Sequence, residues 1–307
     1  MTNFGIKLQI NFANDVKQVM LDQLKKAGFI YNTKLEVDDL VRQYFNIRFR
    51  EVEVRPRQVH ISKELSAKLP VGDLKIGYDN IVALAKSGGH LNSYLSMELL
   101  KPDYKDPLLY DWRIHHFHLG TLPDKGDQRF ITRTNELLYV RVEADDFYCI
   151  DILNHDPVNG FANKQLIEII HQNWPQLIAR DRFSNIPQPT GDLSNEQIDK
   201  IRQANVTAFV STSDGTAYMP AGGGYATDGS SIMVTRQADI LLTHIFSVEE
   251  AVKADDSSVR QAVVDRGIKC PRTIKVKLQG WDEQGVLAIE KKTDTKLRLM
   301  WPQPETD

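Results

Sequence analysis

Cysteine, long apolar runs and excess charge are all scarce in this sequence of 307 residues. Cys149 and Cys270 share no motif with each other or with a histidine, which excludes a CxxC zinc site and favours a reduced, cytoplasmic setting. The longest apolar runs fall short of the ~20 residues of a membrane span, and the first residues show no secretory signal, so we expect no membrane partner. The formal net charge of −3 argues against a protein that coats nucleic acid non-specifically.

Charge is distributed unevenly along the chain. Residues 1–70 hold 12 Lys/Arg and 8 Asp/Glu, which gives +4 and leaves −7 for the rest of the chain (−3 − 4). A basic segment can steer an anionic partner, and an ordinary solvated surface has the same composition. The length suits two domains, or one large domain with extensions.

Changes of hydrophobic period and composition predict three consecutive regions. We expect a mainly helical, basic N-terminal region over 1–100, and an antiparallel sheet with a helix over 101–180. A polar linker at 181–195, which contains two prolines, leads to an α+β C-terminal domain over 196–307. The chain is therefore predicted to be an α+β protein whose central antiparallel sheet is flanked by helices.

The middle region carries the clearest pattern. A strand over 114–119 precedes a hairpin whose strands cover 137–143 and 147–153. A helix near 164–179 follows, and Pro175 is expected to kink it or end it early. Outside this region, helices are predicted over 13–28, 36–46, 71–86 and through Leu241–Val248, and strands over 208–211, 216–219 and the tail from Thr273.

Three of the eight histidines lie within five residues, on the predicted strand 114–119. Alternate side chains of a strand share a face, so His116 and His118 lie together, while His115 lies with Arg113 on the other face. Histidine titrates near neutrality and suits proton transfer, metal ligation or phosphate binding. A buried histidine is also often part of the hydrogen-bonded core, so the cluster by itself does not name a reaction.

Metal ligation is one interpretation of this cluster. His116 and His118 form a His-x-His pair that binds Zn²⁺ or Mn²⁺ if a third ligand converges on it. The available ligands are Asp111, Asp151 and His155, although no motif of HEXXH type supports them. A divalent-metal-dependent hydrolase that uses these histidines and Asp151 is therefore an alternative.

Acid–base chemistry on RNA without metal or cofactor is the leading interpretation. Cleavage through the 2′-hydroxyl needs a base, an acid and cations around the phosphate. The arginine guanidinium suits the last role because its planar fork binds phosphate oxygens in pairs and stays charged. The candidates are His116 and His118 for proton transfer, His155 in support, and Arg113, Arg129 and Arg133 for phosphate binding.

The run from Gln128 to Arg133, with the hairpin that ends at His155, resembles the final antiparallel strands of RelE/HigB-type toxins. The resemblance covers about 100–180. Those small ribonucleases carry an arginine that leads into a strand, a hairpin, and a basic or histidine residue at its end. They are short stand-alone chains whose helices usually precede the sheet, whereas one helix here follows it. The resemblance implies phosphate binding by Arg129 or Arg133 and proton transfer by His116, His118 or His155.

The leading hypothesis is therefore a metal-independent endoribonuclease-like effector of the toxin or phage-defence type. Its expected partners are RNA and a protein such as an antitoxin. The chain is also similar in kind to bacterial proteins of mobile or defence islands. Besides the metal-dependent hydrolase, a non-catalytic interaction subunit of such a system stays open, with histidines that pack or bind a partner.

Two further segments favour structural interpretations. The glycines before Tyr225 lead into a helix and could cradle a phosphate, but no Gly-Lys-Ser/Thr follows them. A tight loop with Ser230 or Ser231 as helix N-cap is favoured instead. No GxSxG elbow indicates a serine hydrolase, and Cys149 is expected to fill the core.

Overall fold

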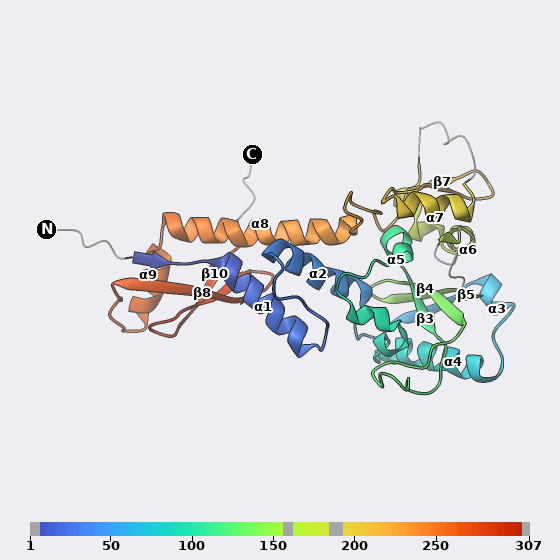
Figure 1. Ribbon diagram of the computed structural model, residues 1–307, viewed down its shortest axis with the longest axis horizontal. Coiled ribbons are helices and arrows are strands. Elements are labelled where there is room, and N and C mark those ends of the chain that lie inside the picture. The colour runs from blue at the N-terminus through green and yellow to red at the C-terminus, as the bar shows by residue number, and fades with distance from the viewer. Residues whose placement is uncertain (1–6, 156–161, 184–192, 303–307) are drawn as a thin grey trace. The chain divides into compact units, whose positions relative to one another are not determined.

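The computed structural model describes residues 7–155, 162–183 and 193–302 (Figure 1). The chain forms two compact units. Unit 1 combines Met1–Phe45 with Arg236–Asp307, and unit 2 is the continuous segment Asn46–Thr235. Among the described residues, no helix is both long and apolar enough to cross a membrane.

The two units do not follow the three predicted consecutive regions. The boundary predicted at residue 100 falls inside unit 2, because strand β2 (Gln58–Ile61) pairs with strand β5 (Asp146–Asn154). The predicted C-terminal domain 196–307 is divided between the units, since the strands of its second half pair with an N-terminal strand. Within the predicted linker at 181–195, residues 184–192 lie outside the described part of the chain.

Unit 2 is built on a four-stranded mixed sheet with the strand order β2-β5-β4-β3. Besides β2 and β5, its strands are β3 (Ile114–His118) and β4 (Glu136–Val142). The antiparallel pairing of β3, β4 and β5 is the predicted one, whereas β2 is parallel to β5. Together with the helices, the sheet confirms the α+β fold class. The sequence pattern misses β2, a four-residue strand, because Pro56 and the nearby arginines indicate an irregular connector.

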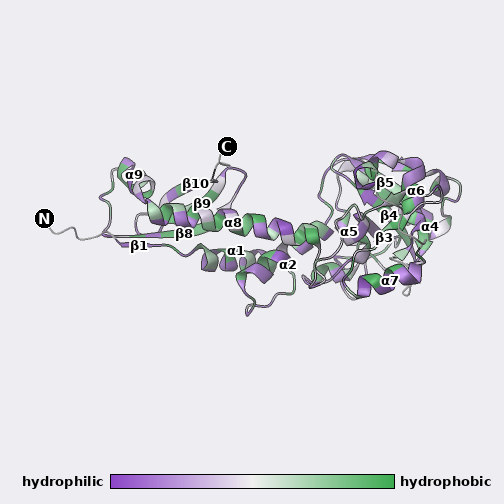
Figure 2. Ribbon diagram, turned by 90° about the horizontal axis from the view of Figure 1, so that it is seen from above, coloured by the Kyte–Doolittle hydropathy of each residue, from purple (hydrophilic) through white to green (hydrophobic). Residues whose placement is uncertain are grey.

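A hydrophobic core joins one face of this sheet to three helices, α5 (Pro107–Trp112), α6 (Gln165–Asn173) and α7 (Asn195–Gln203). In Figure 2, α7 alternates between hydrophobic and hydrophilic residues, as an amphipathic helix does. Helix α6 ends at Asn173 and Pro175 opens a 3₁₀ turn, which confirms the predicted early end. The core includes Trp112, Ile114, Tyr139, Ile150 and Ile170.

Two helices from the predicted N-terminal region, α3 (Lys63–Ser66) and α4 (Gly72–Ser87), also belong to unit 2. Helix α4 approaches the end of β3 closely, since a Cβ on Gly77 would lie 2.0 Å from the carbonyl oxygen of Leu119. Only glycine fits at this contact. Cys149 is fully buried in β5, and burial raises the pKa of its thiol to about 12, which confirms its predicted place in the core.

The segment between the sheet and α8 holds the second predicted hairpin, with strands β6 (Val210–Ser211) and β7 (Ala217–Tyr218). The glycine-rich loop that follows packs tightly, because a Cβ on Gly222 would lie 2.2 Å from the carbonyl oxygen of Tyr110. The Ser231 hydroxyl accepts a hydrogen bond from the Val234 N–H at 3.5 Å where α8 begins. The loop is therefore a structural turn, as favoured from the sequence.

Unit 1 contains a second four-stranded sheet, in the order β1-β8-β9-β10. The strand β1 is parallel to β8, and β8, β9 and β10 form the predicted antiparallel tail. Its strands are β1 (Lys7–Gln9), β8 (Thr273–Trp281), β9 (Gly285–Glu290) and β10 (Thr295–Met300). The helices are α1 (Phe12–Lys26) and α9 (Ser257–Asp265), with α2 (Val37–Arg50) and α8 (Ile232–Ala254) each running across a unit boundary.

Candidate active site

The strand that carries the histidines lies at an edge of the unit 2 sheet and is buried along its whole length. It follows directly after α5, which begins with Asp106 as N-cap and Pro107 in its first turn. The Asp106 side chain accepts a hydrogen bond from the Leu109 N–H at 3.0 Å. The helix ends at Arg113, whose φ of 56° turns the chain into β3. Helix and strand are thus joined by a single residue in the left-handed region.

The strand alternation of the histidines is confirmed. His116 lies opposite Tyr139 in the antiparallel register, and their ring centroids are 6.5 Å apart. His115 stacks on Phe117 with ring centroids 6.2 Å apart. Arg113 does not share the face of His115 as predicted, because it caps α5 and lies outside the strand.

His118 is held in one orientation. Its side chain is 2% exposed, and its Nδ1 accepts a hydrogen bond from the Thr134 N–H at 3.2 Å. The proton of the neutral ring therefore lies on Nε2. Burial lowers the pKa of His118 to about 4, and the nearby charges of His116 and Arg133 act in the same direction. His118 is a neutral, fixed side chain at pH 7.

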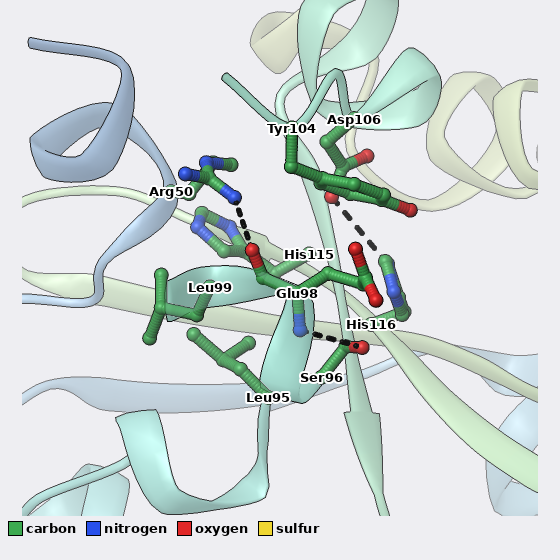
Figure 3. Close-up of a pocket in the computed structure, with 9 residues that line it drawn as sticks. All are labelled: Arg50, Leu95, Ser96, Glu98, Leu99, Tyr104, Asp106, His115 and His116. Carbon is green, nitrogen blue, oxygen red and sulfur yellow. Dashed lines mark hydrogen bonds and ion pairs between the residues drawn. The ribbon is translucent and has the colours of Figure 1, made fainter. Parts of the chain in front are cut away.

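His116 faces a carboxylate. Its Nδ1 lies 3.8 Å from the Oδ2 atom of Asp106, as Figure 3 shows. Burial lowers the pKa of His116, Asp106 opposes this shift, and His155 and Arg133 add to it. Asp106 therefore has two roles, since it caps α5 and also stabilises a proton on His116.

Strand topology brings His155 and Arg133 to this pair. His118 lies opposite Leu137, which lies opposite Leu153, so β3 and β5 end where β4 begins. His155 follows the end of β5, and Arg133 precedes the start of β4. Their charges lower the pKa of both His116 and His118, as positive charges nearby do. The histidine cluster consists of His116, His118, His155 and Arg133.

The cluster has a buried side and an exposed side. His116 and His118 are buried, whereas His155 is partly exposed and Arg133 is exposed. A solute that reaches the cluster therefore meets His155 and Arg133 first. This arrangement suits an anion bound at the surface with a proton acceptor beneath it.

A small hollow lies beside the edge of β3 and next to the cluster (Figure 3). Its volume of about 30 Å³ admits water and no nucleotide. His115, His116, Tyr104 and Asp106 line it. Arg50 also lines it, but its N–H groups donate to the backbone carbonyls of Asn46, Glu98 and Lys101 and so stabilise the wall of the hollow.

His115 has a different environment from the other two histidines of β3. Neither of its ring nitrogens makes a hydrogen bond of normal geometry within the described residues, although the backbone of Arg50 lies close. Burial lowers the pKa of His115 to about 3, and His116, Arg113 and Arg141 add to the shift. The ring is a buried polar group whose hydrogen-bonding capacity is not met by the protein.

Two of the three predicted phosphate-binding arginines lie elsewhere. Arg129 forms an ion pair with Asp127, with 2.7 Å between Nη2 and Oδ2, in the exposed turn after β3. Arg113 pairs with Glu143 at 3.4 Å. Each arginine thus forms an ion pair with a carboxylate close to it. Asp127 lies in the same turn as Arg129, and Glu143 directly follows the end of β4. Of the predicted set, only Arg133 belongs to the histidine cluster.

The carboxylates proposed as metal ligands are neutralised by cations. Asp151 is fully buried and its carboxylate oxygens lie 2.8 and 2.9 Å from Nζ of Lys68. Asp111 pairs with Arg202, with 2.5 Å between Oδ2 and Nε. Over the described ranges, no group of three or more His, Cys, Asp or Glu side chains is arranged to hold a metal ion. Asp151, the carboxylate that the metal-dependent alternative needs, is therefore paired with Lys68.

Sequence reasoning missed the residues that orient the cluster. Asp106 followed by Pro107 is a sequence pattern typical of the start of a helix. Its contact with His116, however, depends on how α5 packs against β3. No sequence pattern points to Thr134, because it contacts His118 through its backbone N–H, a group that every residue except proline has. Outside the cluster, Nδ1 of His171 is hydrogen-bonded to the Tyr218 hydroxyl at 2.8 Å.

No protein-family model, curated protein or solved structure matches the chain. A function for the chain is therefore inferred from the geometry of the histidine cluster.

Proposed function

We propose that unit 2 is a metal-independent endoribonuclease whose active site is the histidine cluster. The convergence of three histidines and Arg133 at one end of the β3-β4-β5 sheet supports this proposal. Histidine pairs supply a base and an acid, and an arginine supplies the positive charge that a phosphodiester needs. The proposal keeps His116, His118, His155 and Arg133 from the sequence prediction.

His116 is the general base. Burial lowers its pKa, so the ring is neutral at pH 7 and can accept the proton of a 2′-hydroxyl. The imidazolium that forms is stabilised by Asp106, whose Oδ2 lies 3.8 Å from Nδ1. Cleavage should therefore decrease on acidification at a lower pH than the ~6.5 at which an ordinary histidine is protonated.

His155 and Arg133 act on the exposed side of the cluster. Arg133 binds the non-bridging phosphate oxygens, and His155 donates a proton to the 5′-oxygen as it leaves phosphorus. The 2′-oxygen forms the new bond to phosphorus, so the products carry a 2′,3′-cyclic phosphate and a 5′-hydroxyl. His118 holds the packing around His116 through its hydrogen bond with the Thr134 N–H.

The substrate lies on the protein surface, since the hollow beside β3 admits only water. A flexible single strand can present its 2′-hydroxyl to a recessed base more readily than a duplex can. We therefore expect cleavage of single-stranded RNA.

Incubation of end-labelled single-stranded RNA with purified protein in EDTA tests the proposal. We expect cyclic phosphate ends, and a decrease in rate of about 10²–10⁴-fold for His116→Ala. Arg129→Ala is the matched control, because Arg129 is bound to Asp127 and should leave the rate unchanged. Absence of cleavage, loss of cleavage in EDTA, or full cleavage by His116→Ala contradicts the proposal.

One observation favours a second candidate, a non-catalytic interaction subunit of a defence or toxin–antitoxin system. All five residues of β3 are buried, as core residues are. Growth after induced expression separates the candidates. An effector arrests growth and His116→Ala relieves the arrest, whereas for an interaction subunit His116→Ala and wild type behave alike.

A further inference from the structure

Unit 1 contains a lysine groove that the histidine cluster does not explain. The groove has a volume of about 750 Å³ and lies between β1, β8 and the start of α1. Lys275 and Lys277 of β8 line it, together with Lys291, which follows β9, and Lys253 of α8. Four cationic side chains thus converge on one depression of the surface.

The sheet register places three of these lysines on one face. Lys275 and Lys277 are two residues apart on β8, so their side chains lie on the same side, about 6.8 Å apart along the strand. Lys277 lies opposite Ile289, and Lys291 is two residues beyond Ile289, with its N–H bonded to the carbonyl of Lys275 at 2.9 Å. The backbone of the sheet thus places the three lysines next to one another on the same face.

One carboxylate, that of Asp15, also lines the groove and lies within electrostatic range of Lys277 and Lys291. Asp15 accepts a hydrogen bond from the Leu278 N–H at 2.8 Å, and Lys253 pairs with Glu249 and Glu250 at 2.7 and 2.8 Å. Within the described residues, the Nζ atoms of Lys275, Lys277 and Lys291 form no ion pair with a carboxylate, although the Lys275 backbone N–H donates to Oε1 of Glu290 at 2.9 Å. These three lysines outnumber the one carboxylate that lines the groove, so the groove presents a net positive charge to an external anion.

The residues that line the groove indicate which anion fits. Ammonium groups spaced along a strand match successive phosphates of an extended nucleic-acid strand, and a groove this large exceeds a single phosphate. No aromatic side chain is present among its described lining residues, so bases have no stacking partner there. A groove of this kind contacts the sugar–phosphate backbone and does not distinguish one base sequence from another.

We propose that the lysine groove of unit 1 binds the phosphate backbone of single-stranded RNA. The site is separate from the histidine cluster and supplies affinity without sequence preference. The choice of RNA as the strand rests on the proposed function of unit 2.

Fluorescence anisotropy with a labelled oligoribonucleotide tests this proposal. The full chain with His116→Ala serves as the background, so that the RNA stays intact and binding is measured whether or not unit 2 is a ribonuclease. Lys275→Glu with Lys277→Glu should weaken binding at least tenfold and lower the slope of log affinity against log salt by about 1.4, at ~0.7 for each lost phosphate contact.

Lys25→Glu with Lys26→Glu is the matched control, because it changes the net charge equally in the exposed last turn of α1. It should bind RNA as the background does. Lys275→Gln with Lys277→Gln, the milder pair, should show the same direction of change if the glutamates disturb folding, which thermal unfolding reports.

Two results overturn the proposal. One is unchanged affinity and salt slope for both Lys275/Lys277 pairs in folded protein. The other is displacement of the RNA by polyglutamate as effectively as by unlabelled RNA, which would assign the groove to an acidic polypeptide. Loss of binding in these variants alongside inactive wild-type protein would instead reject only the ribonuclease proposal.

Discussion

The histidine cluster of unit 2 and the lysine groove of unit 1 both gather groups that can carry positive charge, in opposite environments. His116 and His118 are buried, and burial lowers the pKa of each, so both rings are neutral at pH 7. Lys275 and Lys291 are exposed to solvent and line the groove. Burial converts a cation into a proton acceptor, whereas exposure keeps it as a binding group.

The contrast assigns different tasks to the two regions. A site for proton transfer needs few groups held in fixed positions, and hydrogen bonds such as that between His118 and Thr134 provide this. A site for an extended anion needs several charges on a rigid surface, and strand β8 provides this. Variants in each region should therefore change different measured quantities.

The largest effect expected to separate the two regions concerns Arg133. Arg133→Ala should lower the cleavage rate at saturating RNA by about 10²–10³-fold, because it removes charge that stabilises the transition state. Lys275→Glu with Lys277→Glu should instead raise the RNA concentration needed for half-maximal rate. Steady-state kinetics on a labelled RNA separates the two. An equal effect of both changes on both quantities would remove the distinction between the regions.

The second largest expected effect is the destabilisation of unit 2 by acid. His115 and His118 have pKa values of about 3 and about 4 in the folded chain, below the ~6.5 of unfolded histidine. Between pH 6.5 and 4 the unfolded chain thus binds more protons, and the free energy of unfolding falls as the pH falls.

From pH 7 to pH 5 this loss amounts to about 2 kcal/mol for each histidine. Urea unfolding at several pH values measures it. The pair Lys275→Gln with Lys277→Gln should keep the wild-type pH dependence, and His115→Leu should weaken it. A dependence that His115→Leu leaves untouched would show that His115 titrates normally.

The smallest effect compares two histidines of the same strand at pH 7. His118→Leu leaves the Thr134 N–H without its acceptor and should destabilise unit 2 by about 1–3 kcal/mol. His115→Leu removes a ring whose nitrogens make no hydrogen bond of normal geometry, so stability should stay equal or rise by about 1 kcal/mol. Thermal unfolding of both variants measures these changes in stability. Similar destabilisation by both variants would mean that the ring nitrogens of His115 make hydrogen bonds in solution.

Local pattern was enough for the elements whose residues repeat at a fixed period. The β3 strand, the β4–β5 hairpin and the early end of α6 at Pro175 were all predictable. The strand β2 was not, because four residues carry too little periodicity to distinguish a strand from a connector. The division into units was also unpredictable, since β1 and β8 pair across most of the chain.

The sequence by itself determined which residues could do chemistry and which of them share a strand face, because alternation follows from backbone geometry alone. The tertiary structure decided which of them meet. Arg113 and Arg129 bind nearby carboxylates, Asp151 binds Lys68, and Arg133 joins the histidines. These outcomes depend on strand ends that are far apart in sequence, and on burial, which sets whether a histidine is charged.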